Sequence, residues 1–448
     1  MSGIARVLAA RGASVTGSDL KDSRYLRTLA ESGVRVFLGH AASNLGDPRV
    51  VVVSSAVPET NPELAEARRR GLPVWPRARM LAHLAGDRQT VAVAGTHGKT
   101  TTSSMIAKML DGAGADPTFL IGGELNDMGA NARCGQGRHY VVEADESDGS
   151  FMFLDPRVAV VTNVEADHLD HYADLAEVCR TFVAFLSKTS EDGCVVTCAD
   201  DAGAVRVARA CGRRAVTYGT AEDADVRCEG MRREGEGYAF TLRVPGGERT
   251  EAVTKVPGMH NVLNATAALA TAWVLDVDLS AAAESLAAFT GVRRRFDRLG
   301  EAAGVTVVDD YAHHPTEVRA TLAAAREGGY RRVVAVFQPH RFSRTAALGR
   351  EFAEAFEAAD RVVLMDVYGA GESPIPGVSG KTVLDAVLGA RPRSRVAYLP
   401  HRGDVASFVA ASVLPGDLVL TMGAGDVTTL GPELLRELGG GEAAAACS

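Results

Sequence analysis

Residues 90–102 read Thr-Val-Ala-Val-Ala-Gly-Thr-His-Gly-Lys-Thr-Thr-Thr, and the rest of the chain can be interpreted around them. An apolar, partly β-branched run leads into a loop with two glycines, and helix-compatible residues follow as far as residue 110. A strand, a glycine loop and a helix in this order are typical of a phosphate-binding loop, in which backbone N–H groups and the helix N-terminus face the phosphates. This stretch therefore predicts a nucleotide-phosphate site in a parallel α/β fold.

The residues of this loop have separate expected roles. Lys99 can reach the outer phosphates, and the Thr100 hydroxyl can bind Mg²⁺. The spacing departs from the usual G-x-x-x-x-G-K-[ST] motif because Val93 stands where the first glycine should be. Gly-Lys-Thr alone is compatible with an ordinary helix start, but the strand before it and the helix after it favour phosphate binding. The expected cofactor-binding residues here are Ala94, Gly95, Thr96, His97, Gly98, Lys99 and Thr100.

The composition indicates the class of protein. A chain of 448 residues, 46% hydrophobic and 23% charged, has room for two to three globular domains. A net charge of -8 argues against nucleic acid and anionic membrane surfaces as partners, and the absence of a long apolar run predicts no membrane insertion. Seven scattered cysteines fit a reducing cytoplasm, and Cys194-x-x-x-Cys198 lacks the second pair or the clustered histidines of a zinc site.

The first 85 residues or so predict alternating short strands and helices. Strands are expected at residues 13–16, 50–54 and 73–75, and helices at residues 25–32 and 62–70. This alternation favours a parallel sheet. Residues 3–11 look like a helix that follows a glycine-rich turn, although no strand or turn precedes them. We expect that the chain begins after the central strand of a Rossmann-like unit, so that the neighbouring strands lack ladder partners at the gap.

Polar residues at the strand ends of this region are candidates for substrate binding. Ser18 and Asp19 close the first strand, where an acidic residue often meets a ribose, although a helix N-cap explains the pair equally well. Ser54 and Ser55 end the next strand and are expected to line the same crevice.

Residues 139–143 and 158–162 predict two further strands beside the phosphate loop, each followed by polar residues. Functional groups collect at the carboxyl ends of parallel strands. Glu143 is therefore placed to hold Mg²⁺ near Thr100, and His168 to hold a second metal ion as a neutral imidazole. By itself, an acidic loop is more often a solvated turn.

The remainder of the chain carries three further signals. Residues 214–256 predict a small antiparallel sheet. Asn261 and Asn264 lie on one face of an alanine-rich helix, where they can cap that helix or hydrogen-bond a base. Residues 439–448 are expected to be disordered.

The third segment again predicts an α/β unit. Strands are expected at residues 305–309, 332–337, 361–365, 395–399 and 417–422. Two strand ends, residues 309–317 and 337–345, carry paired histidines and arginines, whereas a lone histidine is more often structural. Arg341 and Arg344 can bind a carboxylate or a transferring phosphate through bidentate hydrogen bonds.

Motifs along essentially the whole chain resemble, in order, those of the Mur ligase family of peptidoglycan synthesis. They are Gly95-Thr96-His97-Gly98-Lys99-Thr100, residues 143–148, residues 162–168, His260-Asn261-x-x-Asn264, Arg294-Arg295-Phe296-Asp297, residues 311–317 and residues 338–345. The resemblance implies three α/β domains. Residues 1–86 would form a Rossmann-like UDP-sugar domain without its first strand and glycine-rich turn, which in the family helps to bind the UDP diphosphate. Residues 87–290 would form a P-loop ATPase domain with parallel and small antiparallel sheets, and residues 291–448 a Rossmann-like amino-acid-binding domain.

The reaction that the resemblance implies is ATP-dependent amide formation in the cytoplasm, with Mg²⁺ or alternatively Mn²⁺, by a monomer or weak homodimer. The lactyl carboxylate of UDP-N-acetylmuramate attacks the γ-phosphate of ATP, and the amine of L-alanine attacks the acyl phosphate. Catalysis of this kind is mostly positioning and charge neutralisation. Because ATP and amino-acid groups come from different domains, closure should assemble the site.

By resemblance, individual residues take the following roles. Lys99 binds the phosphates, Thr100 and Glu143 hold one metal ion, and His168 holds the second. The adenine side is contacted by Asn261 and Asn264, and Arg295 and Asp310 lie where the third domain closes on ATP. The alanine pocket is formed by Tyr311, His313, Arg341 and Arg344. The expected catalytic residues are Lys99, Glu143, His168, His313, Arg341 and Arg344.

Three alternatives stay open at this point. Related ligases join a whole murein tripeptide instead of alanine, and residues 338–341 and 146–148 favour alanine. A P-loop ATPase that acts as a switch or motor would leave the histidines and arginines of the third segment without a role. A non-catalytic nucleotide-binding remnant would conflict with the intact metal and phosphate residues.

Overall fold

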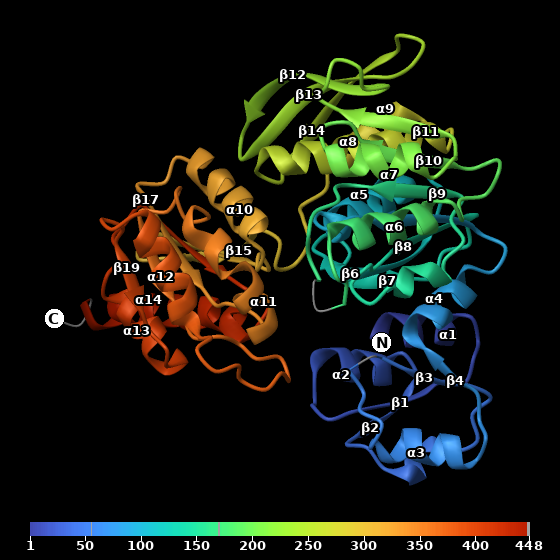
Figure 1. Ribbon diagram of the computed structural model, residues 1–448, viewed down its shortest axis with the longest axis horizontal. Coiled ribbons are helices and arrows are strands. Elements are labelled where there is room, and N and C mark those ends of the chain that lie inside the picture. The colour runs from blue at the N-terminus through green and yellow to red at the C-terminus, as the bar shows by residue number, and fades with distance from the viewer. Residues whose placement is uncertain (55, 169–170, 446–448) are drawn as a thin grey trace.

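The computed structural model describes residues 1–54, 56–168 and 171–445, with side chains described as far as residue 440. Figure 1 shows three bodies in chain order: the N-terminal body lies below the central one, and the C-terminal body lies beside them. Among the described helices, none is long and apolar enough to cross a membrane.

The central body is built around β5 (Gln89–Ala94), which is paired in parallel with β8 (His139–Glu143) on one side and β9 (Val158–Val161) on the other. Residues 91–94 are fully buried, as expected for a parallel strand covered by helices on both faces. The other strands of this ten-stranded sheet are β6 (Thr118–Leu125), β7 (Ala130–Arg133), β10 (Cys194–Cys198), β11 (Ala215–Gly219), β12 (Val226–Glu234), β13 (Gly237–Arg243) and β14 (Arg249–Thr254).

The strand order of this sheet is β14-β13-β12-β11-β10-β9-β5-β8-β6-β7. Of residues 214–256, predicted as a small antiparallel sheet, β12, β13 and β14 are antiparallel and continue the same sheet at one edge. The prediction is wrong for β11, which is parallel to both β10 and β12. The predicted parallel strands at residues 139–143 and 158–162 are confirmed. The carboxyl ends of β5, β8 and β9 therefore lie side by side.

Helices cover both faces of this sheet and fix the phosphate loop. Helix α5 begins at Lys99 and packs against α8, an alanine-rich helix that is buried along most of its length because small side chains permit close helix contact. The helices are α5 (Lys99–Gly112), α6 (Leu175–Leu186), α7 (Ala202–Ala210), α8 (Met259–Val274) and α9 (Leu279–Ala287), with the 3₁₀ turn η2 (Ser150–Phe153).

The N-terminal body contains two separate parallel strand pairs. Strands β1 and β2 pair with each other, as do β3 and β4, and no ladder joins the two pairs among the described residues. Strand β2 was not predicted, because it is short and only half-buried. The elements are α1 (Ser2–Ala10), β1 (Thr16–Asp19), α2 (Arg24–Glu31), β2 (Arg35–Leu38), η1 (Ala42–Leu45), β3 (Val51–Val53), α3 (Pro62–Arg69), β4 (Val74–Pro76) and α4 (Arg77–Ala85).

Helix α1 belongs by packing to the interface with the central body. Ile4 and Val7 are buried in the central hydrophobic core. A Cβ on Gly3 would come within 2.9 Å of the Ala132 Cβ in β7, so only glycine permits this approach. The N-terminal body is thus attached to the central sheet through its first helix.

The C-terminal body has a six-stranded sheet in the order β15-β16-β20-β17-β18-β19, with hydrophobic clusters on both faces. All five predicted strands are present, and β15 adds an unpredicted antiparallel edge. Its strands are β15 (Asp297–Ala302), β16 (Val305–Asp310), β17 (Arg332–Phe337), β18 (Arg361–Leu364), β19 (Val396–Tyr398) and β20 (Asp417–Met422). Its helices are α10 (Pro315–Glu327), α11 (Phe342–Leu348), α12 (Gly380–Ala390), α13 (Val405–Ala410) and α14 (Leu430–Ala445), with η3 (Gly349–Ala353), η4 (Arg402–Asp404) and η5 (Asp426–Thr429).

The prediction of a disordered tail is wrong for residues 439–445. Helix α14 continues through them to Ala445, and the alanines at its end have the highest helix propensity of any residue. The rest of that prediction, residues 446–448, lies outside the described residues.

Candidate active site

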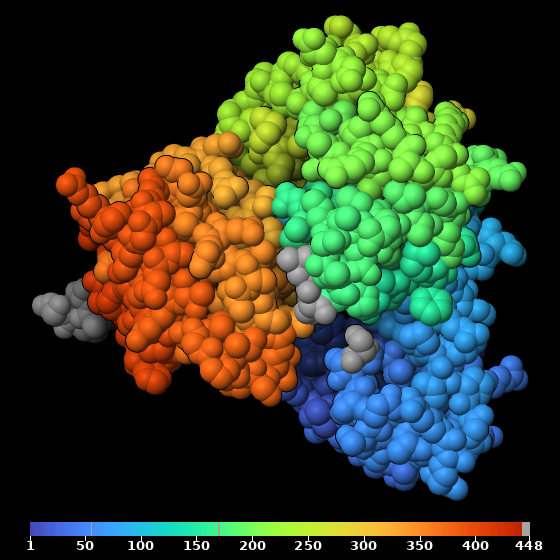
Figure 2. Space-filling view, viewed as in Figure 1, coloured from blue at the N-terminus to red at the C-terminus, as the bar shows by residue number. Residues whose placement is uncertain are grey.

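A cavity of about 1340 Å³ lies where the three bodies meet. Figure 2 shows their blue, green and orange surfaces converging near the middle of the molecule. Arg24 and Ser54 of the N-terminal body, Lys99 of the central body and Arg341 of the C-terminal body line it. A ligand in this cavity can therefore contact all three bodies at once.

The phosphate loop needs both of its glycines. Gly95 and Gly98 have φ angles of +133° and +80°, a region in which other residues are strained. A Cβ on Gly95 would overlap the Thr162 hydroxyl, and one on Gly98 would lie 2.7 Å from Asn264 Oδ1. Since α5 begins directly after this loop, its unpaired N–H groups and the positive end of its dipole are available to an anion.

Lys99 is held at the floor of the cavity. Its Nζ donates to the carbonyl of Gly95 at 2.6 Å and to Glu146 Oε1 at 2.8 Å. Burial opposes its charge, but Glu146 and Asp145 outweigh this effect and raise the pKa of Lys99. Burial also raises the pKa of Glu146 to about 7, although Lys99 opposes this shift. A phosphate oxygen in the position of the Glu146 carboxylate could accept the same hydrogen bond from the Lys99 ammonium group.

Thr100 and Glu143 form an oxygen cluster beside this lysine. The Thr100 hydroxyl lies 3.0 and 3.1 Å from the two Glu143 carboxylate oxygens, and the Gly122 N–H donates to Oε2 at 2.8 Å. A hydroxyl and a carboxylate are ligands that Mg²⁺ accepts together with phosphate oxygens. The predicted pair thus fits a magnesium nucleotide.

His168 follows β9 on the other side of the loop. Its Nε2 lies 3.8 Å from Glu146 Oε1 and 3.6 Å from Asp167 Oδ2. Burial lowers the pKa of His168, so the imidazole is neutral near pH 7 and can act as a ligand. Its φ of +56° is unusual for a residue other than glycine.

Two arginines of the C-terminal body face this loop. Arg344 donates to Asp167 Oδ1 at 3.0 Å and Oδ2 at 3.2 Å, and both side chains are less than a tenth exposed. Arg341 Nε donates to Glu372 Oε1 at 2.6 Å. Both guanidinium groups already bind carboxylates, which is the chemistry expected of an amino-acid carboxylate site.

The aromatic rings of Tyr311 and His313 line the cavity together with two further arginines. The guanidinium groups of Arg294 and Arg295 lie 4.8 and 5.1 Å from the centre of the Tyr311 ring. His313 Nδ1 lies 2.9 Å from the Tyr311 carbonyl, and burial lowers the pKa of His313 to about 3. The His313 ring is therefore neutral, with Nδ1 carrying the proton in this contact.

Three residues that are expected to contact the nucleotide, Asn261, Asn264 and Asp310, hydrogen-bond to other groups of the protein. Asn264 accepts from the Thr102 hydroxyl at 3.1 Å and donates to Asn261 Oδ1 at 3.0 Å, and Asn261 donates to the Pro257 carbonyl at 2.7 Å. Asp310 accepts from the backbone N–H groups of Phe296 and Ala312, each at 2.7 Å. In this structure the asparagines brace the phosphate loop from behind, and their contact with adenine stays a prediction.

The expected substrate residues of the N-terminal body are dispersed. Ser54 lines the cavity, whereas Ser55 lies outside the described residues. Ser18 donates to Glu63 Oε2 at 2.9 Å, and Asp19 accepts from the Lys21 N–H at 3.0 Å in a local turn. The roles of Ser18 and Asp19 toward a substrate therefore stay predictions.

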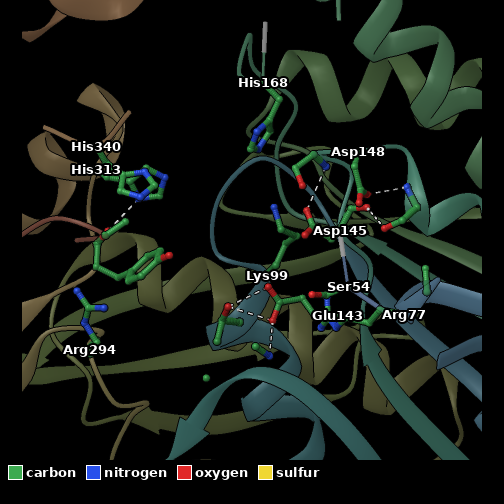
Figure 3. Close-up of a pocket in the computed structure, with 18 of the residues that line it drawn as sticks. Ser54, Arg77, Lys99, Glu143, Asp145, Asp148, His168, Arg294, His313 and His340 are labelled. Atoms are coloured by element: carbon green, nitrogen blue, oxygen red, sulfur yellow. Dashed lines mark hydrogen bonds between the residues drawn. The ribbon is translucent and has the colours of Figure 1, made fainter. Parts of the chain in front are cut away.

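Several residues that line or organise this site cannot be assigned from the sequence. Asp167 and Glu146 stand in the motifs at residues 162–168 and 143–148, but an ion-pair partner on another segment cannot be read from a motif. Arg24, which pairs with Glu124 of β6, has no signal in the sequence at all. Figure 3 shows Lys99, Glu143, Asp145 and His168 on one side of the cavity, with His313, His340 and Arg294 across from them.

Comparison with known proteins gives matches along most of the chain. Residues 1–89 match the Mur ligase family catalytic domain, residues 93–272 the Mur ligase middle domain, and residues 294–425 the Mur ligase glutamate ligase domain.

Similar proteins share both the sequence and the fold. The UDP-N-acetylmuramate–L-alanine ligase of Syntrophotalea carbinolica is 49% identical over 98% of this chain and 95% of its own length, and that of Acidothermus cellulolyticus is 50% identical over 98% and 92%. The crystal structure of UDP-N-acetylmuramate-alanine ligase from Thermotoga maritima matches with a TM-score of 0.81 at 30% identity, covering 98% of this chain and 96% of that one. A murein peptide ligase from Psychrobacter arcticus matches with a TM-score of 0.75 at 25% identity and the same coverage. The chain belongs to the Mur ligase family.

Proposed function

We propose that this protein is an ATP-dependent ligase that joins L-alanine to the lactyl carboxylate of UDP-N-acetylmuramate, in the synthesis of peptidoglycan precursors. The observation that carries this proposal is the single cavity in which a phosphate loop faces two carboxylate-binding arginines from another domain. The relatives that carry this name are about half identical to the chain over nearly its whole length.

The reaction has two steps that the cavity can bring together. The lactyl carboxylate attacks the γ-phosphate of ATP, which releases ADP and forms an acyl phosphate. The amine of alanine then attacks the carbonyl carbon, and inorganic phosphate leaves. Lys99 and the loop N–H groups hold and neutralise the transferring phosphate, a task in which positioning and electrostatics dominate.

Thr100 and Glu143 are the residues that would hold Mg²⁺ (or Mn²⁺), and His168 would hold a second ion. When bound, these ions supply positive charge that neutralises the phosphate oxygens. The hydrogen bond between Gly122 and Glu143 keeps the carboxylate turned toward Thr100 before nucleotide arrives. The described cysteines are free, which fits a reaction in the cytoplasm.

Arg341 and Arg344 would receive the carboxylate of alanine. Arg344 is paired with Asp167 in this structure, so binding of alanine exchanges one carboxylate for another. Tyr311 and His313 close the pocket beside them. Ser54 would contact the nucleotide sugar from the N-terminal body.

The competing candidate is ligation of a murein tripeptide, since a murein peptide ligase has a similar fold. Phosphate release should be measured with ATP, Mg²⁺ and UDP-N-acetylmuramate, adding either L-alanine or the tripeptide. We expect alanine to stimulate release far more than the tripeptide. Stimulation by the tripeptide alone would reassign the substrate, and release that ignores both acceptors would contradict ligation.

A further inference from the structure

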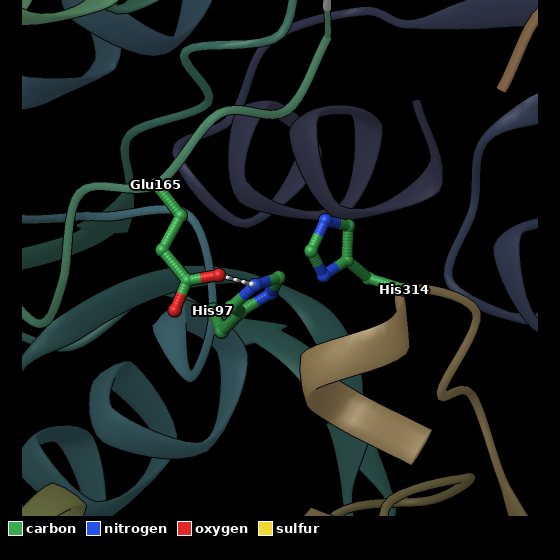
Figure 4. Close-up of side chains that lie close together, drawn as sticks. All are labelled: His97, Glu165 and His314. Carbon is green, nitrogen blue, oxygen red and sulfur yellow. Dashed lines mark ion pairs between the residues drawn. The ribbon is translucent and has the colours of Figure 1, made fainter. Parts of the chain in front are cut away.

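Three side chains from distant segments converge beside the phosphate loop. His97 lies in that loop, Glu165 follows β9, and His314 immediately precedes α10 of the C-terminal body. One potential ligand atom from each lies within 4.8 Å of the other two. Figure 4 shows the Glu165 carboxylate directed at the His97 ring, with the His314 ring on its other side.

The geometry around His97 is that of a supported metal ligand. Its Nε2 lies 3.5 Å from Glu165 Oε2, and its Nδ1 lies 3.2 Å from Glu317 Oε1. Metal-binding histidines usually donate their second ring N–H to a carboxylate, which fixes the tautomer and leaves the other nitrogen for the ion. Two ligand atoms on a tetrahedral ion with bonds of about 2.0–2.2 Å stand roughly 3.5 Å apart, as His97 Nε2 and Glu165 Oε2 do.

Two buried nitrogens in this cluster make no hydrogen bond of normal length. The Nε2 atoms of His97 and His314 are both buried and hydrogen-bond to no described residue, and His97 Nε2 has the Glu165 carboxylate 3.5 Å away. The two rings lie 4.7 Å apart between their centres. Buried polar atoms of this kind are costly unless something binds them, and a cation between the rings would satisfy both.

We propose that His97, Glu165 and His314 form a binding site for a divalent transition-metal ion such as Zn²⁺ or Co²⁺, which bridges the central and C-terminal bodies. Two imidazoles and one carboxylate are the donor set of such ions, whereas Mg²⁺ prefers oxygen ligands. The site is thus chemically distinct from the Thr100–Glu143 pair.

The surrounding charges favour a cation in this place. Glu165 and Glu317 flank His97, with carboxylate oxygens 3.5 Å from its Nε2 and 3.2 Å from its Nδ1. A metal ion would take the place of the His97 proton between these carboxylates. Glu165 is itself oriented by the Thr316 hydroxyl, which donates to Oε2 at 2.9 Å.

The site is complete only when the two bodies are together, because His97 and Glu165 come from one and His314 from the other. A bound ion therefore links the phosphate loop to the N-terminus of α10. His314 also caps α10 through a long contact of 3.3 Å from the Thr316 N–H to Nδ1, which a rotating ring can give up.

The test is titration of the nucleotide-free, full-length protein with Co²⁺, followed by visible absorption and by equilibrium dialysis for stoichiometry. His314→Gln and Glu165→Gln should each weaken binding at least about tenfold. The exposed His401→Gln is the matched control and should bind as wild type does. Loss of the helix cap could unfold the His314→Gln variant. The Glu165→Gln variant keeps an oxygen that accepts the hydrogen bond from Thr316, so it still tests the site in that case.

A His168→Gln variant separates this site from the proposed magnesium site. If it keeps the Co²⁺ signal while Glu165→Gln loses it, the bridging site is supported. If His168→Gln abolishes the signal, or if Glu165→Gln and His314→Gln bind Co²⁺ like wild type, the proposal is wrong. These readouts require no ligase activity, so they are independent of the proposed function.

Discussion

At Gly98 the backbone enters the left-handed region with a φ of +80°, and the Asn264 side chain occupies the space that a Cβ would need. The loop motif by itself predicts the roles of Lys99 and Thr100, because their chemistry follows from spacing along one segment. It does not predict Asn264, which arrives through the packing of α8 against α5. Residue roles that depend on contact between distant segments cannot be read from a local pattern.

The change Gly98→Ala should abolish most ATP binding. The left-handed conformation costs about 1–2 kcal/mol with a Cβ, and the clash with Asn264 displaces the loop. Gly114→Ala is the matched control, since Gly114 has a φ of +77° with open space around it. Unfolding by denaturant should show a similar loss of stability from backbone strain in both variants. Calorimetry should show a loss of ATP affinity only in Gly98→Ala. Equal ATP affinity in the two variants would contradict the role of this glycine.

Among the elements, buried strands were predicted well and half-buried ones were not. Strands β5, β8 and β9 each contain a buried apolar run, at residues 91–94, 140–142 and 158–161, so their sequence reports their burial. Strands β2 and β15 are partly exposed, and β15 also carries a register shift between Arg298 and Gly300, so neither has a clear apolar pattern. The histidines predicted at the strand end of residues 309–317 directly precede α10, but the contact of α10 with the phosphate loop depends on how the domains pack.

The contact between Glu317 of α10 and His97 of the phosphate loop should make the free energy of unfolding depend on pH. His97 has a pKa raised to about 9 in the folded protein, against an ordinary value of 6.5. Its proton therefore contributes stability below pH 6.5, and this contribution, up to about 3 kcal/mol, is lost as pH rises through 9. Glu317→Gln removes one of the two carboxylates that raise the pKa of His97, so the free energy of unfolding should fall less steeply with pH in this variant.

The measurement is the free energy of unfolding between pH 6.5 and 9.5, with a chelator present to exclude metal binding. Glu327→Gln, in the last turn of the same helix, is the control and should keep the wild-type slope. The same decline in wild type and Glu317→Gln would show that His97 does not titrate as described.

For the whole molecule, three α/β bodies and their order follow from the sequence, but their mutual placement does not. The ion pair between Arg344 and Asp167 and the contact between His97 and Glu317 both cross from the central to the C-terminal body. They hold the two bodies together around the cavity. Such contacts depend on the angle between domains, which no pattern within one domain encodes.

Arg344→Lys should weaken alanine binding through this interface. Lysine keeps the charge but loses the bidentate hydrogen bonds, and one such bond to a charged group is worth about 1.5–3 kcal/mol. We expect the KM for alanine to rise about 10- to 100-fold, while the KM for ATP changes little. Arg391→Lys, in a surface pair with Glu357, should leave both values unchanged. A larger effect on ATP than on alanine would place Arg344 at the nucleotide instead.

In the proposed reaction, a carboxylate attacks ATP in this cavity before alanine is joined. The most direct measurement uses UDP-N-acetylmuramate labelled with oxygen-18 in its lactyl carboxylate, together with ATP, Mg²⁺ and L-alanine, and analyses the products by mass spectrometry. We expect the released phosphate to carry oxygen-18 and the sugar nucleotide to gain one amide-linked alanine. Unlabelled phosphate, released without alanine in the product, would contradict it.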